Sequence, residues 1–263
     1  MTADQVHNGR VTGYIDAGGV HTYYDARGAG DPVVMLHGGF ATIETWEAQA
    51  AGLAERYRVF LPERRGHGRT PDVDGPLTYE AMAADTAAFM EALGIGPAHL
   101  VGWSDGASVA LYVALRRPEL VRKVICMGAP AWFDGFTPAT KAVALNLSLD
   151  HMPPSMIEAH RNLSPDGPDH LPVFFAKIAA MWASEPQMTR EELRQIAAPT
   201  LVILGDDDVL TVEHAATMAA TLPDAQLAVV PGTDHGLLFE KPDLVSRLFL
   251  DFLADEQPPK VMS

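Results

Sequence analysis

The segment Gly102-Trp103-Ser104-Asp105-Gly106 places a serine between two glycines at the spacing Gly-x-Ser-x-Gly. The short apolar run His99 to Val101 precedes it, and a helical pattern from Gly106 to Arg117 follows. A serine on a sharp strand-to-helix turn needs small residues on both sides, because a side chain there would collide with neighbouring backbone. The pattern therefore predicts a nucleophile elbow, which presents the Ser104 hydroxyl at the carboxyl end of a strand.

A serine hydroxyl is a weak nucleophile unless a base accepts its proton and a third group orients that base. The chain supplies candidates for both partners, in the order acid and then histidine. An aspartate run, 206–208, follows the apolar run Thr200 to Leu204, and His235 follows the apolar run Gln226 to Val230. Catalytic groups of parallel sheets collect at the carboxyl ends of the strands. We expect His235 to be the base and one of these aspartates to orient it.

The elements that must position these groups are six short runs rich in Val, Leu and Ile, separated by segments of helical period such as Tyr79 to Leu93. Such runs are typical of parallel strands that are buried on both faces and joined by helices. An antiparallel hairpin, Val11 to Tyr14 and Val20 to Tyr24, is expected at the sheet's edge. The predicted fold class is α/β, with a mostly parallel twisted sheet flanked by helices. The six runs are Pro32 to Leu36, Tyr57 to Leu61, His99 to Val101, Val124 to Met127, Thr200 to Leu204 and Gln226 to Val230.

Residues 131–196 break this alternation, because they contain several prolines, many large apolar side chains and no convincing strand. We expect a helical cap over this range, inserted into one core domain made of residues 1–130 and 197–263. Its aromatic and methionine residues either pack the cap's own core or form an apolar pocket for a small substrate. The candidate pocket residues are Phe40, Trp103, Trp132, Phe136 and Trp182.

Composition limits the functional classes. The net charge of −15, without a cluster of Lys and Arg, disfavours binding to nucleic acid or to anionic membranes. No apolar run is long enough to span a membrane, and the polar segment Met1 to Arg10 does not have the pattern of a secretory signal, so a cytoplasmic location is expected. The single cysteine, Cys126, cannot form an internal disulfide. No group has the spacing of metal ligands. We expect a small-molecule substrate, no cofactor and no metal, and the oligomeric state, a homo-oligomer included, stays open.

The chain resembles the α/β-hydrolase superfamily in five motifs that span nearly everything except the cap. The resemblance implies an α/β-hydrolase fold, a cap domain and a serine nucleophile of the esterase-like branch. The motifs are His37-Gly38-Gly39-Phe40, Arg65-Gly66-His67-Gly68, Gly102-Trp103-Ser104-Asp105-Gly106, Gly205-x-x-Asp208 and Pro231-Gly-Thr-Asp-His235.

The resemblance also assigns roles to single residues. In this family the acid is usually the aspartate three residues after the glycine, which selects Asp208; relatives that place the acid after the preceding strand would leave Asp134 as the candidate. Two backbone amides then form the oxyanion hole, that of Asp105 and that of Gly39, with Phe40 as the alternative to Gly39. The nearby histidines, His37 and His67, are expected to shape their loops.

Asp105 suggests a more specific hypothesis. The elbow Trp-Ser-Asp-Gly resembles that of biphenyl-hydrolase-like and valacyclovir-hydrolase proteins, in which this aspartate recognises an α-amino group. The simpler interpretation is that an acidic residue in the first turn of a helix is favoured by the helix dipole.

Several activities share the same triad. The expected activity is cleavage of a carboxylic ester; the alternatives are a lactonase, a carbon-carbon bond hydrolase, a cofactor-free perhydrolase, or a binding or sensor protein with slow turnover. A serine at position 104 argues against haloalkane dehalogenases and epoxide hydrolases, which use aspartate there, and the cap lacks the tyrosines of epoxide hydrolases. The segment His-Gly-Gly-Phe-Ala also departs from the His-Gly-Gly-Pro-Gly that is typical of proline iminopeptidases.

Overall fold

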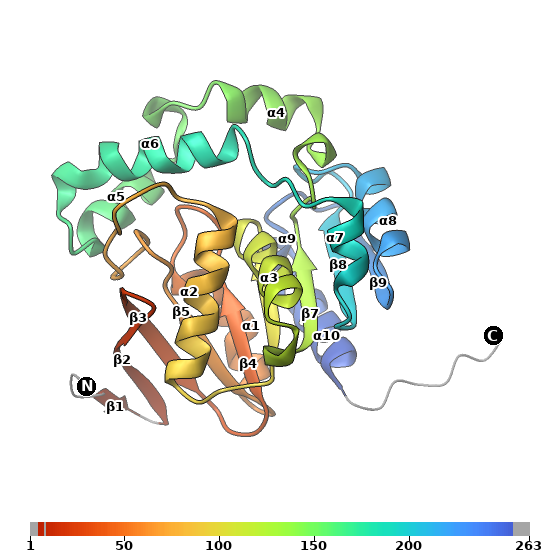
Figure 1. Cartoon of the computed structure of the whole chain (residues 1–263), viewed down its shortest axis with the longest axis horizontal. Helices are drawn as coiled ribbons and strands as arrows, with labels where there is room; N and C mark the ends of the chain where they lie inside the picture. Colours follow the sequence, from red (N-terminus) through yellow and green to blue (C-terminus); the bar gives the residue numbers. More distant parts are fainter. Residues whose placement is uncertain (1–4, 8, 255–263) are drawn as a thin grey trace.

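The computed structural model describes residues 5–7 and 9–254, and at its centre lies a sheet of nine strands (Figure 1). The strand order is β1-β2-β3-β5-β4-β6-β7-β8-β9. Strands β4 to β9 run parallel to one another, while β1, β2 and β3 form an antiparallel extension that pairs with β5. The predicted α/β fold with a mostly parallel sheet is confirmed. The strands are β1 (Gln5–His7), β2 (Arg10–Ala17), β3 (Val20–Arg27), β4 (Pro32–Leu36), β5 (Arg58–Pro62), β6 (Ala98–Trp103), β7 (Val121–Met127), β8 (Thr200–Gly205) and β9 (Ala225–Val230).

The predicted hairpin exists as β2 and β3, with longer strands than the sequence indicated. It is not the outermost part of the sheet, since β1 pairs with β2 on one side and β3 pairs with β5 on the other. Strand β1 has only three residues, which is too short to produce a readable alternation of apolar and polar side chains. The outer ends of the predicted core segments, 1–4 and 255–263, lie outside the described residues.

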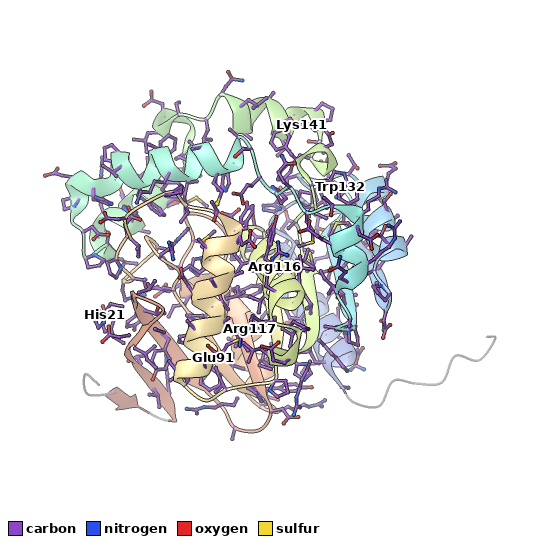
Figure 2. All side chains as sticks on the ribbon, in the orientation of Figure 1. His21, Glu91, Arg116, Arg117, Trp132 and Lys141 are labelled. Carbon is purple, nitrogen blue, oxygen red and sulfur yellow. The ribbon has the colours of Figure 1, made fainter. Side chains whose placement is uncertain are left out.

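Helices cover both faces of the sheet (Figure 1). Buried side chains of α2, α3 and α8 pack on one face, and those of α1 and α10 pack on the other. The end of α3 is also tied to α2 by ion pairs, among them Arg117 Nη2 to Glu91 Oε1 at 2.6 Å, both labelled in Figure 2. In the part of the chain that the structure describes, no helix combines the length and apolarity needed to cross a membrane. The helices are α1 (Glu47–Leu53), α2 (Tyr79–Ala92), α3 (Asp105–Arg116), α4 (Pro138–Leu145), α5 (Pro154–Leu163), α6 (Leu171–Trp182), α7 (Arg190–Gln195), α8 (Val212–Thr221), α9 (Leu237–Glu240) and α10 (Pro242–Leu253).

The inserted segment between β7 and β8 forms α4, α5 and α6, which lie across one end of the sheet (Figure 1). Its last helix, α7, instead contacts α3 and α8 of the core. At the start of the insertion, the Ala131 N–H donates to His214 Nε2 at 3.1 Å, and the Trp132 ring lies 4.4 Å from the His214 ring. The insertion is therefore anchored to the core by α8 before it crosses the sheet.

The turn between β6 and α3 depends on two close backbone approaches. A Cβ atom on Gly102 would lie 2.3 Å from the Gly106 carbonyl oxygen, and one on Gly106 would lie 2.0 Å from the Leu36 carbonyl oxygen. Both distances are far below van der Waals contact, and the obstructing atoms are backbone. The two glycines let α3 begin directly over the end of the neighbouring strand β4.

We predict that Gly106→Ala lowers the free energy of unfolding by about 3 kcal/mol, because the new methyl group must displace the backbone of β4. Gly52→Ala in α1 is the matched control: no atom lies within 4 Å of its added Cβ, and alanine favours the helix, so a gain of about 0.5 to 1 kcal/mol is expected. Urea unfolding of both variants measures these values. Equal effects at the two positions would contradict the packing argument.

Candidate active site

Ser104, His235 and Asp208 form one continuous chain of hydrogen bonds at the carboxyl edge of the sheet. His235 Nε2 lies 3.0 Å from Ser104 Oγ, and His235 Nδ1 lies 2.7 Å from Asp208 Oδ1. Because the carboxylate accepts at Nδ1, that nitrogen carries the proton and Nε2 is free to accept one from the serine. The structure thus joins Ser104 to two residues that lie more than a hundred positions later in the sequence.

Ser104 has backbone angles φ 55° and ψ −125°, a conformation that residues other than glycine rarely adopt. Such a conformation costs on the order of 1 to 3 kcal/mol and persists only where the surroundings enforce it. Here the Ser104 N–H donates to the Met127 carbonyl at 2.8 Å, and its carbonyl accepts from Ala107 N–H at 2.9 Å. Neighbouring backbone on both sides therefore holds the hydroxyl outward from the turn.

The side chain of Asp208 is fully buried, and backbone groups hold it in place. Its Oδ2 accepts the Gly205 N–H at 3.1 Å, and its Oδ1 accepts the Val209 N–H at 2.7 Å. Asp206 instead accepts the Thr233 N–H, and the alternative acid Asp134 is exposed and paired with Lys141. Of the acids considered from the sequence, Asp208 is the one that meets the histidine.

His235 is fixed from two further directions. The indole Nε1 of Trp103 donates to the His235 carbonyl at 3.0 Å, and the two rings lie 5.2 Å apart. On another side, a Cβ on Gly128 would lie only 3.0 Å from the imidazole, so the absence of a side chain there makes room for the ring. The imidazole is thereby confined to the line between Asp208 and Ser104.

The loop after β4 borders the serine. A Cβ on Gly38 would lie 3.3 Å from Ser104 Cβ, and one on Gly39 would lie 2.4 Å from Asp105 Oδ2. Neither the Gly39 N–H nor the Asp105 N–H donates a hydrogen bond to another described residue. Phe40 follows with φ 53°. Two unengaged backbone amides thus lie beside Ser104, on the two segments where the sequence predicts the oxyanion hole.

The Asp105 carboxylate is buried and bound by two aromatic side chains. Tyr79 Oη donates to Oδ1 at 2.8 Å, and Trp182 Nε1 lies 3.0 Å from each carboxylate oxygen. Burial, reinforced by the Asp105 charge, raises the pKa of Tyr79 well above its ordinary value, so its hydroxyl stays a donor. Since Trp182 ends α6, this contact ties the cap directly to the first turn of α3.

A cavity of about 200 Å³ opens on Ser104 and His235. Of the predicted pocket residues, Phe136 and Trp182 line it, whereas Phe40, Trp103 and Trp132 do not. Phe40 is buried against Phe174 and Phe175 of the cap, and Trp103 is buried behind His235. Trp132 lies beside α7 and α8, where Figure 2 labels it, and packs on His214. The aromatic residue types in the sequence indicated apolar positions, but they did not show whether each ring points into the cavity or away from it. The lining consists of Tyr79, Ser104, Asp105, Phe136, Thr140, Val143, Ala144, Trp182, Val209 and His235.

Residues 33–248 match the model of a family described as the alpha/beta hydrolase family. The chain belongs to this α/β-hydrolase family.

Relatives within the family carry out different reactions. The chain is 31% identical to the 2-hydroxy-6-oxo-6-phenylhexa-2,4-dienoate hydrolase of Burkholderia cepacia, with 87% of this chain and 89% of the relative covered. It is 30% identical to a non-heme haloperoxidase of Rhodococcus erythropolis, with 89% and 96% covered. Among solved structures, a meta-cleavage product hydrolase of Pseudomonas fluorescens IP01 matches with a TM-score of 0.76 at 25% identity, covering 91% of this chain and 96% of that one.

Behind the loop after β4, this α/β hydrolase buries a basic cluster. Arg64, His37 and His67 are all almost inaccessible to solvent. Burial lowers the pKa of Arg64 to about 10, and burial together with the Arg64 charge lowers the pKa of His37 and His67 well below the ordinary range. Both histidines are therefore neutral, and Arg64 carries the charge.

Two polar residues near the site, Tyr79 and Arg64, were not predicted from the sequence, nor were the cavity-lining residues Thr140, Val143, Ala144 and Val209. Tyr79 was noted only as the start of a helix, and Arg64 precedes the Arg-Gly-His-Gly motif without belonging to it. A signal for Arg64 was present in the run Glu63-Arg64-Arg65, because two arginines beside a buried strand cannot both reach solvent easily. No local pattern points to the contact of Tyr79 with Asp105.

Metal and thiol chemistry have no visible basis near this site. No group of three or more metal-ligating side chains occurs within residues 5–7 and 9–254. Cys126 is buried in β7, and burial raises the pKa of its thiol to about 12. The thiol therefore stays protonated and unreactive at neutral pH.

We predict that Trp182→Phe lowers the free energy of unfolding by about 1 to 3 kcal/mol, because it removes a donor to a buried carboxylate while keeping an aromatic ring. The control is Trp132→Phe, since the Trp132 indole N–H donates to no described residue. Urea unfolding compares the two. A loss for Trp182→Phe no larger than that for Trp132→Phe would show that the hydrogen bond to Asp105 does not hold the cap.

Proposed function

We propose that this α/β hydrolase cleaves a carboxylic ester of a small, uncharged, largely apolar substrate through a Ser104-His235-Asp208 triad. The observation that carries the proposal is the unbroken hydrogen-bond chain of these residues, with the serine end opening into the cavity. The family membership supports hydrolysis as the general reaction.

The mechanism follows from the protonation states of Ser104, His235 and Asp208 in their chain of hydrogen bonds. His235 Nε2 takes the proton of Ser104 as Oγ attacks the ester carbonyl, and Asp208 stabilises the imidazolium that forms. The amides of Asp105 and Gly39 donate to the oxyanion, where each such donor contributes roughly 3 to 4 kcal/mol. His235 then protonates the leaving alcohol, and water repeats the sequence to release the acid and restore Ser104.

The charge of the cavity supports an uncharged substrate. Among the described residues, its lining contains no Lys or Arg but does contain the Asp105 carboxylate. A substrate carboxylate would lose its hydration there without gaining a cation, which is unfavourable. Two aromatic donors already occupy the Asp105 carboxylate, which disfavours the hypothesis that it recognises a substrate amino group.

Carbon-carbon bond hydrolysis is the second candidate, because the Burkholderia relative is named for a dienoate substrate and the fold matches a meta-cleavage product hydrolase. The dienoate in the Burkholderia relative's name carries a carboxylate, and the lack of Lys and Arg among the described residues that line the cavity supports ester cleavage as the first candidate. Lactone opening, perhydrolysis and slow-turnover binding are the remaining alternatives, to be tested if the protein hydrolyses no ester in the experiment below.

We expect the native protein to hydrolyse p-nitrophenyl esters with an optimum at short acyl chains, because a cavity of about 200 Å³ accommodates only a few carbons beside the leaving group. Ser104→Ala should abolish turnover, since it removes the nucleophile. The measurement is steady-state release of p-nitrophenol along the series from acetate to decanoate. Activity that survives in Ser104→Ala would refute the triad, and a folded native protein inactive on every ester would redirect the search to lactones, carbon-carbon substrates, peroxide-dependent activity or binding.

Asp208→Asn should lower kcat by about 10³- to 10⁴-fold, because the amide cannot hold the imidazole in the required tautomer and charge state. The adjacent, exposed Asp207 provides the matched control, and Asp207→Asn should leave kcat within about twofold. Both variants are assayed with p-nitrophenyl acetate after urea unfolding has shown that they fold. Near-normal turnover in Asp208→Asn would exclude this residue as the acid.

A further inference from the structure

The carbonyl of Gly38 receives an unusual number of donors. His37 Nδ1 lies 2.8 Å from this oxygen and Arg64 Nη2 lies 2.9 Å from it, with the Ala41 N–H more distant at 3.3 Å. The backbone N–H of Arg64 donates to His37 Nε2 at 3.2 Å, so the imidazole proton is on Nδ1 and points at the Gly38 carbonyl. Arg64 Nη2 also lies 3.2 Å from His37 Nδ1, but a protonated Nδ1 cannot accept, so the Gly38 oxygen is the acceptor for both side chains. One of the two side-chain donors carries a full positive charge.

The contacts to the Gly38 carbonyl matter for the proposed reaction, because this oxygen belongs to the same peptide as the Gly39 N–H, the proposed oxyanion donor. The Gly38–Gly39 peptide is trans, so its carbonyl and its N–H point in opposite directions. Arg64 and His37 occupy the carbonyl side, while Ser104 borders Gly38 and the Asp105 carboxylate borders Gly39. Holding the carbonyl toward Arg64 therefore turns the Gly39 N–H away from Arg64, and this N–H donates to no other described residue.

The buried charge of Arg64 is costly if its role is only to fill space. Its Nε and Nη1 have no hydrogen-bond partner among the described residues, and no carboxylate pairs with it directly. Burial of a guanidinium with unpaired donors is energetically unfavourable. The next residue shows the usual arrangement, because Arg65 forms two hydrogen bonds with the Asp85 carboxylate, at 2.5 Å and 2.6 Å.

We propose that Arg64 is a positioning residue for the oxyanion hole: through the Gly38 carbonyl it fixes the orientation of the Gly39 N–H and strengthens it as a donor. A charge-assisted hydrogen bond to a peptide carbonyl polarises the peptide, which makes its own N–H a better donor. Rotation of this peptide would replace the donor by a carbonyl oxygen that repels the oxyanion. The inference rests on the proposed acyl transfer at Ser104, and Arg64 itself touches no substrate.

The test compares Arg64→Met, which removes charge and donors, with Arg64→Lys, which keeps the charge. With p-nitrophenyl acetate, Arg64→Met should lower kcat by about 10- to 100-fold, less than the loss of an entire oxyanion donor, with KM changed by less than about threefold. The Ki of phenylboronic acid, which forms a tetrahedral adduct with a serine, should rise by the same factor. Arg64→Lys should recover part of both losses.

Arg65→Met is the matched control, because it removes the adjacent arginine and its ion pair but touches neither Gly38 nor Ser104. It should lower stability while leaving kcat per folded molecule within about twofold. A loss of kcat in Arg64→Met without a parallel rise in the boronate Ki, or an equal loss in Arg65→Met, would overturn the proposal.

A second measurement covers the case in which Arg64→Met does not fold. In native protein labelled with ¹⁵N-glycine, the Gly39 amide proton should shift downfield when phenylboronic acid saturates Ser104, and this shift should be smaller in Arg64→Lys. A Gly39 signal that does not move would overturn the role of Arg64. Failure of the proposed function is distinct, since the native protein would then show no Ser104-dependent turnover and no boronate adduct.

Discussion

The close approach of α3 to the end of β4 is the constraint on which the site depends. Because Gly106 has no side chain, the first turn of α3 lies directly against the Leu36 carbonyl, and Gly102 allows the turn to close behind it. This contact places Ser104, Asp105 and the loop after β4 within a few ångströms of one another. A larger residue at either glycine would separate Ser104 from the loop after β4, however well the rest of the sheet packed.

Three buried charged side chains lie around Ser104: the carboxylates of Asp208 and Asp105, and the guanidinium of Arg64. The carboxylate of Asp208 is hydrogen-bonded to His235, while that of Asp105 is bound by Tyr79 and Trp182. Arg64 lies on the far side of the loop after β4, and the Asp105 charge partly offsets the effect of burial on the pKa of Arg64. Hydrogen bonds thus fix the charged groups around Ser104, and in the proposed mechanism such preorganised groups need no reorganisation during the reaction.

The cap stabilises the surroundings of Ser104 through individual side-chain contacts as well as by lying over this end of the sheet. Trp182 reaches from α6 to Asp105, and Phe40 is enclosed by Phe174 and Phe175 of the same helix. Phe40 has a left-handed backbone conformation, which is unfavourable for a bulky residue and is held by this aromatic packing. The loop after β4 is consequently supported by Arg64 from the core and, through Phe40, by the aromatic rings of the cap.

Local patterns in the sequence predicted most of the strands, the elbow at Ser104 and the sheet edge at which it meets His235 and an aspartate of the run 206–208, because periodicity and glycine spacing act over short stretches of chain. The choice of Asp208 within that run came from the family resemblance. Local patterns could not assign Phe40, Trp103 and Trp132, since an apolar ring fits equally well in a pocket wall or behind it. Nor could they reveal the contacts of Tyr79 with Asp105 or of Arg64 with Gly38, which join segments of chain more than twenty residues apart. Only the tertiary structure decided those pairings, because the partner of a buried polar side chain is set by which groups packing brings within hydrogen-bond distance.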